Sequence, residues 1–156
     1  LDGCGGEGVF HLTAEDRNVT AILELGTRHG STFQIAQAYV PEIRDGDKRI
    51  IVVEGEPVGA VLRTPLHWET RANFHVGGTA VKSALTPRDR EICARIGPML
   101  REFGIVFAGI DVIGRWLTEV NVTSPTGIQE INRLDGVVLE RQVLDAVERR
   151  KRALGG

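Results

Sequence analysis

The chain has 156 residues, of which 19 are basic and 21 acidic, so its formal net charge is −2. This balance excludes the basic surface that a general nucleic-acid-binding protein needs. No apolar run reaches the roughly 18 residues of a membrane span, so we expect no membrane association. The two cysteines, Cys4 and Cys93, are too few for a disulfide framework and indicate a reducing, cytoplasmic compartment.

The first half of the chain predicts, in order, a strand, a helix, a strand, a hairpin and a long loop. The helix is capped by Asp16 or Asn18 and stops at Gly30. The hairpin is predicted from two β-branched runs around a Glu-Gly-Glu-Pro turn. The strands are expected at residues 9–12 and 33–40, the hairpin strands at 48–53 and 58–63, and the loop at 66–80.

The second half predicts a helix, a hairpin and a further helix. Thr86, Pro87 and Asp89 form a strong helix start, and Gly104 ends the helix, which Pro98 should kink or divide. The hairpin strands are expected at 105–113 and 116–122, and the last helix at about 137–153. The sum is an α+β fold with antiparallel hairpins and three helices.

Three polar side chains interrupt the apolar strands of the second hairpin. Glu119 and Asn121 are two residues apart, so they project from the same face of one strand. A three-residue turn would pair Asp111 with Glu119, whereas a two-residue turn would pair Asp111 with Thr118 and put Glu119 on the opposite face. Two carboxylates and an amide oxygen on one face could hold a hard cation such as Mg²⁺; the alternative is an ordinary solvent-facing hairpin.

Several segments together resemble the bacterial glutathione synthetase family of ATP-grasp ligases. Glu-Val-Asn after an Asp-bearing strand resembles the metal-binding hairpin of ATP-grasp enzymes. The other matching segments are Leu-Asp-Gly-Cys-Gly-Gly at 1–6, Arg-Asp-Gly-Asp-Lys-Arg at 44–49, Glu-Thr-Arg-Ala-Asn at 69–73 with Gly77-Gly78, and Asn-Val-Thr-Ser-Pro-Thr at 121–126. The resemblance covers roughly residues 1–150. It implies that residues 1–156 are the C-terminal ATP-grasp region, with an antiparallel sheet and flanking helices.

The resemblance also implies roles for individual residues. It places the nucleotide against Gly3, Gly5 and Gly6, which would cover the triphosphate, and against Gln37, Tyr39, Val40 and Asp47. It assigns the phosphoryl group and the acyl phosphate to the catalytic arginines Arg49, Arg63 and Arg71. It assigns substrate binding to Arg63, Asn73, Ser124 and Thr126, and the metal, Mg²⁺ or Mn²⁺, to Asp111, Glu119 and Asn121.

The implied reaction is ATP-dependent amide formation between γ-glutamylcysteine and glycine, in a homo-oligomeric enzyme. Two departures from the family pattern bear on this expectation. Leu66-His67-Trp68 stands where a Gln-Gly-Gly-like stretch is usual, and none of the three lysines occupies the position of the family's upstream ATP-binding lysines. We therefore expect the isolated chain to be a fragment with little or no ligase activity. The alternatives are another ATP-grasp ligase of the D-alanine–D-alanine type and a nucleotide-binding module without turnover.

Overall fold

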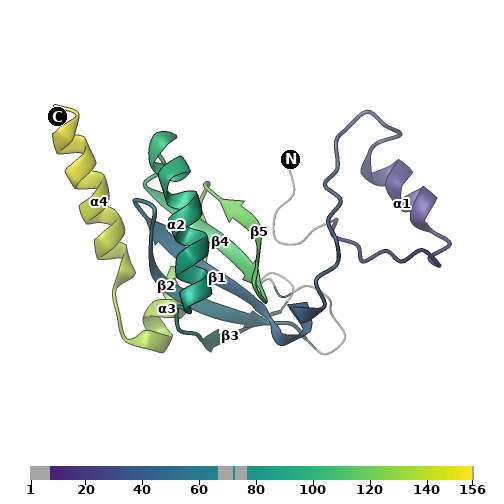
Figure 1. Ribbon diagram of the computed structural model, residues 1–156, viewed down its shortest axis with the longest axis horizontal. Coiled ribbons are helices and arrows are strands. Elements are labelled where there is room, and N and C mark those ends of the chain that lie inside the picture. Colours follow the sequence, from purple (N-terminus) through teal and green to yellow (C-terminus); the bar gives the residue numbers. More distant parts are fainter. Residues whose placement is uncertain (1–7, 67–71, 73–76, 156) are drawn as a thin grey trace.

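The structure is a computed structural model that describes residues 8–66, 72 and 77–155. Within these residues five strands form one antiparallel sheet in the order β3-β2-β1-β4-β5 (Figure 1). The strands are β1 (Asp47–Val53), β2 (Glu56–Thr64), β3 (Thr79–Lys82), β4 (Phe107–Ile113) and β5 (Trp116–Asn121). The predicted α+β class, with an antiparallel sheet and flanking helices, is confirmed.

The sheet is covered by helices on both faces, and strand β1 lies at its centre. Ile50 and Val52 point toward helix α2 (Pro87–Glu102), where Ile92, Cys93 and Leu100 are also buried. The alternate residues Ile51 and Val53 point toward helices α3 (Ile128–Asp135) and α4 (Leu139–Ala153). The Ile-Ile-Val-Val run is apolar without alternation because both of its faces are buried.

Helix α2 begins as the sequence predicts. The Thr86 hydroxyl accepts a hydrogen bond from the backbone N–H of Asp89, and the Asp89 carboxylate accepts one from the backbone N–H of Thr86. Pro98 does not divide the helix, so that alternative is wrong. Helix α3 was not predicted; it is only eight residues long and begins directly after Gly127, which has a positive φ of 119°.

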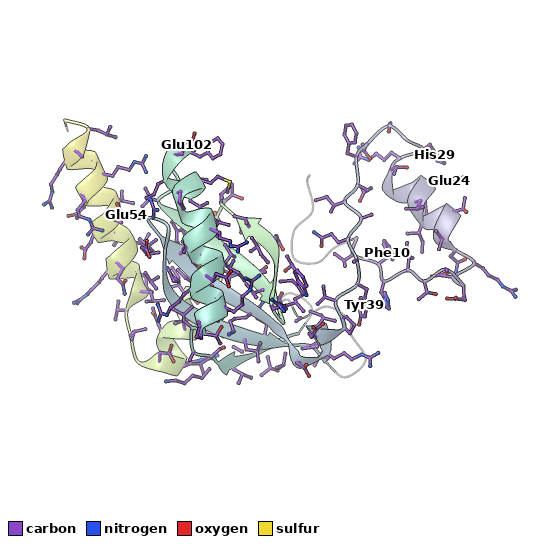
Figure 2. All side chains as sticks on the ribbon, viewed as in Figure 1. Phe10, Glu24, His29, Tyr39, Glu54 and Glu102 are labelled. Atoms are coloured by element: carbon purple, nitrogen blue, oxygen red, sulfur yellow. The ribbon has the colours of Figure 1, made fainter. Side chains whose placement is uncertain are left out.

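The region before the sheet differs most from expectation. It contains helix α1 (Val19–Gly26) and the 3₁₀ helix η1 (Pro41–Asp45), but the strands predicted at 9–12 and 33–40 are wrong. Both segments are extended, and they pair with no strand among the described residues, so they lack the ladder that defines a strand. Figure 2 shows Phe10 and Tyr39 on these two segments, away from the sheet.

Both hairpin turns consist of two residues. The first is Glu54–Gly55 rather than the four residues expected, and both residues have positive φ, as a tight hairpin turn requires. The predicted loop at 66–80 is also too long, because Thr79 and Ala80 already pair with β2. In the part of the chain that the structure describes, no helix is both long enough and apolar enough to cross a membrane.

Candidate functional site

Four charged side chains are buried at one end of the sheet, on the face that also carries α3 and α4. Asp47 and Arg49 precede Ile51 at every second position of β1, so the apolar layer becomes charged along the same strand. Strand pairing adds Arg63 of β2 opposite Asp47, and Asp111 of β4 opposite Arg49. All four residues are at most 7% exposed. We call them the buried charge cluster.

Arg49 makes hydrogen bonds in two directions inside the protein. Its Nε donates to Asp111 Oδ1 at 2.5 Å, and its Nη2 donates to Asp111 Oδ2 at 2.9 Å. Its Nη1 donates to the backbone carbonyl of Thr126 at 2.9 Å. Arg49 therefore joins β4 to the turn that follows β5, with the planar two-bond geometry that an arginine offers a carboxylate.

Arg63 links the two carboxylates of the cluster. Its Nη2 donates to Asp47 Oδ2 and lies 2.9 Å from Asp111 Oδ2. Asp47 Oδ1 is buried and has no hydrogen-bond partner among the described residues. Because two arginines face two aspartates, the cluster has no net charge, and each ion is stabilised by a partner from a different strand.

The two carboxyl groups of the cluster have opposite pKa shifts. Burial, followed by the negative charge of Asp111, raises the pKa of Asp47 to about 6. Burial alone would raise the pKa of Asp111 as well, but the hydrogen bonds and positive charges of Arg49 and Arg63 outweigh burial and lower it. Asp111 is thus held as a carboxylate, while Asp47 gains a proton in mildly acidic solution.

A bulge in the second hairpin decides where Glu119 points. The turn is the two-residue Gly114–Arg115, yet Asp111 pairs with Glu119 and not with Thr118. The register shifts because Thr118 is an extra residue of β5, and its hydroxyl donates to the backbone carbonyl of Asp111 at 3.1 Å. Neither of the two alternatives holds as stated: the turn has the two residues of the first alternative, but Asp111 pairs with Glu119 as in the second.

Glu119 and Asn121 extend the cluster toward solvent on the same face. Asn121 pairs with Gly109, and its amide donates to Glu119 Oε1 at 2.9 Å. Glu119 is exposed and Asn121 is half-buried, in contrast to Asp111. The arrangement is a row of oxygen atoms that begins at a buried carboxylate and ends at an accessible one.

This donor set fits Mg²⁺, which usually takes one or two carboxylates together with substrate phosphates. Asp111 Oδ2 contacts both arginines, whereas Oδ1 accepts a hydrogen bond from Arg49 alone and has a second lone pair to offer. No group of three His, Cys, Asp or Glu residues that could hold a metal occurs in the described ranges. A metal at this site would therefore rely on Asn121 and on a bound substrate as well as on the two carboxylates.

Two glycines leave room for the Arg49 side chain. A Cβ at Gly109 would lie 2.6 Å from the Cβ of Pro125 and 3.2 Å from the Cδ of Arg49. A Cβ at Gly127 would lie 3.0 Å from the Cγ of Arg49, and this glycine also has a positive φ. Neither glycine was among the predicted site residues; for Gly109, an isolated glycine within an apolar strand was the available signal.

The remaining predicted residues fall into three groups. Gln37, Tyr39 and Val40 lie on the extended segment that leads into η1 and β1, and the Tyr39 ring stacks on His11 with centroids 3.8 Å apart. Ser124 and Thr126 are exposed in the turn that follows β5. The others lie outside the described residues: Gly3, Gly5, Gly6, Arg71 and Asn73.

Comparison with known proteins gives two kinds of match, a protein family and individual relatives. The family model described as "Prokaryotic glutathione synthetase, ATP-grasp domain" matches residues 1–136. The glutathione synthetase of Brucella melitensis is 55% identical over 154 residues, which are 97% of this chain and 48% of that protein. That of Gloeobacter violaceus is 55% identical over 145 residues, which are 93% of this chain and 45% of that protein.

A third relative, the glutathione synthetase of Mesorhizobium japonicum, is 51% identical over 155 residues, covering 97% of this chain and 49% of that protein. The chain thus spans about half the length of the curated relatives that it matches. The matched residues include the complete buried charge cluster, Glu119 and Asn121. The chain belongs to the prokaryotic glutathione synthetase family and carries its ATP-grasp domain.

Proposed function

We propose that this chain is the nucleotide- and metal-binding part of a ligase that joins γ-glutamylcysteine to glycine at the expense of ATP. The observation that carries this proposal is the row of oxygen ligands formed by Asp111, Glu119 and Asn121, directly beside two buried arginines. Phosphoryl transfer needs little covalent help from a protein, but it needs positioned positive charge around the phosphates. The family membership selects this reaction among the phosphoryl transfers that such a site could serve.

The reaction has two steps. The cysteine carboxylate of γ-glutamylcysteine attacks the γ-phosphorus of ATP, which forms an acyl phosphate and releases ADP. The amine of glycine then attacks the acyl carbon, an amide bond forms, phosphate leaves, and the amine loses a proton. Bound Mg²⁺ would neutralise charge on the phosphates, and Asp111, Glu119 and Asn121 would hold it.

The cluster residues would have separate tasks. Asp111 fixes Arg49 and Arg63 at one end of the row of ligands, so that both positive charges are ordered before substrate binds. The unpaired oxygen of Asp47 supports its predicted contact with the nucleotide, because a buried acceptor calls for a donor such as a hydroxyl. The roles of Arg71 and Asn73 on the substrates, and of Gly3, Gly5 and Gly6 over the triphosphate, stay predictions.

The test is product formation by the full-length protein. Incubation with ATP, Mg²⁺, γ-glutamylcysteine and glycine should release ADP and yield glutathione, identified by its mass. The same mixture with D-alanine as both substrates is the control for the other ATP-grasp ligase. ADP release only with D-alanine, or nucleotide binding without any turnover, would contradict the proposal. We also expect this enzyme to be cytoplasmic.

A further inference from the structure

The turn that follows β5 rests on the side chain of Arg49. Nη1 of Arg49 donates to the backbone carbonyl of Thr126 at 2.9 Å, while its Nε and Nη2 donate to the carboxylate of Asp111. Asp111 lies on β4 and is itself buried, so the guanidinium is fixed from below by the sheet. We call residues 122–127 the β5 turn; its position depends on this buried pair of side chains.

The backbone of the β5 turn has an unusual shape. Ser124 has a positive φ of 50°, although it carries a side chain and precedes a proline. A residue with a side chain rarely adopts a positive φ, and a residue before proline is normally extended. Such a conformation persists only where surrounding contacts fix it. The hydrogen bond from Arg49 to Thr126, two residues further on, supplies such a contact from the buried layer.

Two glycines leave the space in which Arg49 and the β5 turn meet. A Cβ at Gly109 would lie 2.6 Å from the Cβ of Pro125 and 3.3 Å from Nη1 of Arg49. A Cβ at Gly127 would lie 3.0 Å from the Cγ of Arg49. Because a larger residue at either position would press on the arginine, on the turn or on both, the fit between them is close.

Arg49 is too enclosed to serve as a phosphate-binding arginine. It is 4% exposed, and three of its five N–H groups donate within the protein. Ser124 and Thr126, in contrast, are exposed on the turn that it supports, a few residues after Asn121. A substrate can therefore reach the turn, whereas the guanidinium lies beneath it.

We propose that Arg49 is a positioning residue, which acts on the peptide substrate through the β5 turn and does not touch the phosphoryl group. Its bond to Thr126 holds the turn in the shape in which Ser124 and Thr126 bind γ-glutamylcysteine. This inference rests on the proposed function, because it takes γ-glutamylcysteine as the substrate. It replaces the contact with the acyl phosphate that the family resemblance implies for Arg49.

Amide hydrogen exchange of the full-length protein, without substrates, tests the structural part of the proposal. Arg49→Lys keeps the positive charge, but a single ammonium group lacks the planar fork that bonds Asp111 and the Thr126 carbonyl together. Peptides that contain residues 122–127 should exchange about tenfold faster than in the wild type, whereas peptides from α2 should be unchanged. Unchanged exchange in the β5 turn would overturn the proposal. This readout depends on no reaction.

Steady-state kinetics tests the functional part. Arg49→Lys should raise the KM for γ-glutamylcysteine by about tenfold and leave kcat and the KM for ATP within about threefold of wild type. A large fall in kcat with an unchanged KM would show that Arg49 acts on the phosphoryl group, and would overturn the proposal. A wild type that forms no glutathione would refute the proposed function, while the exchange of the β5 turn would still show whether Arg49 supports it.

A pair of glycine substitutions decides if Arg49→Lys fails to fold. Gly109→Ala keeps Arg49 but presses on its Nη1 and on Pro125, so it should speed exchange in the β5 turn and raise the KM for γ-glutamylcysteine. Gly59→Ala is the matched control, because its Cβ would meet the Cδ1 of Leu139 at 2.8 Å and not the turn; it should change neither quantity. Equal effects of the two variants would mean that loss of stability alone is responsible, and would overturn the proposal.

Discussion

The charged end of the sheet and the arm formed by residues 8–40 are held together in different ways. In the first region four ionic side chains are buried and bonded across three strands, with partners 16 and 62 residues apart in sequence. In the second region α1 has no buried residue, and apolar side chains such as Leu25 and Phe33 are 74% and 91% exposed. One region is fixed by long-range contacts, and the other by its own local turns.

This difference predicts which region tolerates the loss of a side chain. Local hydrogen bonds organise the arm, such as those from Thr27 Oγ1 to the carbonyl of Leu23 and from Gln34 Nε2 to that of Gly26. Removing one side chain there affects one turn. At the charged end each side chain serves two others, so one deletion leaves buried charges without partners.

The largest expected effect is at Asp111. Asp111→Ala removes the shared acceptor of Arg49 and Arg63 and should lower the free energy of unfolding by about 3–5 kcal/mol. Glu119 lies opposite Asp111 in the neighbouring strand, but its carboxylate is exposed. Glu119→Ala should therefore lower the free energy of unfolding by less than about 1 kcal/mol. Urea denaturation of both variants measures the contrast. Equal losses would show that burial does not distinguish the two carboxylates.

A smaller effect is expected from the pKa of Asp47. Its pKa is raised from 3.8 to about 6, so the folded state holds this proton more tightly than the unfolded state does. Its contribution to stability should therefore fall as the pH rises from about 4 to about 6, by up to about 3 kcal/mol. Melting temperatures of the wild type and Asp47→Asn across this range should diverge. Parallel curves would show that Asp47 has an ordinary pKa.

Replacing one glycine by alanine in each region tests the same contrast, with a smaller expected change in the free energy of unfolding. Gly109→Ala pushes a Cβ against Pro125 and Arg49, and should destabilise the protein by about 1–3 kcal/mol. Gly26→Ala, at the end of α1, meets only Gln34 at 3.7 Å and should be neutral or stabilise by up to about 1 kcal/mol. Thermal unfolding of the pair is the measurement, and destabilisation by Gly26→Ala would mean that the arm is packed more tightly than its exposure indicates.

The smallest effect is expected on the surface of the arm. Leu25→Ser and Phe33→Ser should each change the free energy of unfolding by less than about 0.5 kcal/mol, because both side chains are already largely in solvent. Ile51→Ala, in the fully buried layer beside Arg49, should cost about 2–5 kcal/mol. A loss above 2 kcal/mol for either arm variant would reveal an apolar partner for the arm.

The sequence-based predictions were most accurate for elements that depend on local residue patterns. The capping residues of α2 and the two β-hairpins have strong local signals, and the structure has them within a few residues of the expected positions. The segments at 9–12 and 33–40 also look like strands, but a strand needs a neighbour, and local sequence does not report whether one is present. Helix α3 is short, and its start depends on Gly127, whose backbone conformation is not visible in the residue type alone.

The same limit applies to the site. Spacing placed Glu119 and Asn121 on one face, but the turn length alone would have put Asp111 opposite Thr118. Only the bulge, supported by the Thr118 hydroxyl, restores the pairing of Asp111 with Glu119. The mutual bonding of Arg49, Arg63 and Asp111 was not foreseen either, because it joins residues that come together only when three strands align.

The central claim is that the face shared by Asp111, Glu119 and Asn121 is where phosphoryl transfer takes place. The most direct test is the rate of ADP release by full-length Glu119→Gln with ATP, Mg²⁺, γ-glutamylcysteine and glycine. We expect a melting temperature within a few degrees of wild type and a rate reduced by about 100-fold or more, because the substitution removes a proposed metal ligand whose side chain is exposed and leaves the fold intact. A wild-type rate in this variant would contradict the account.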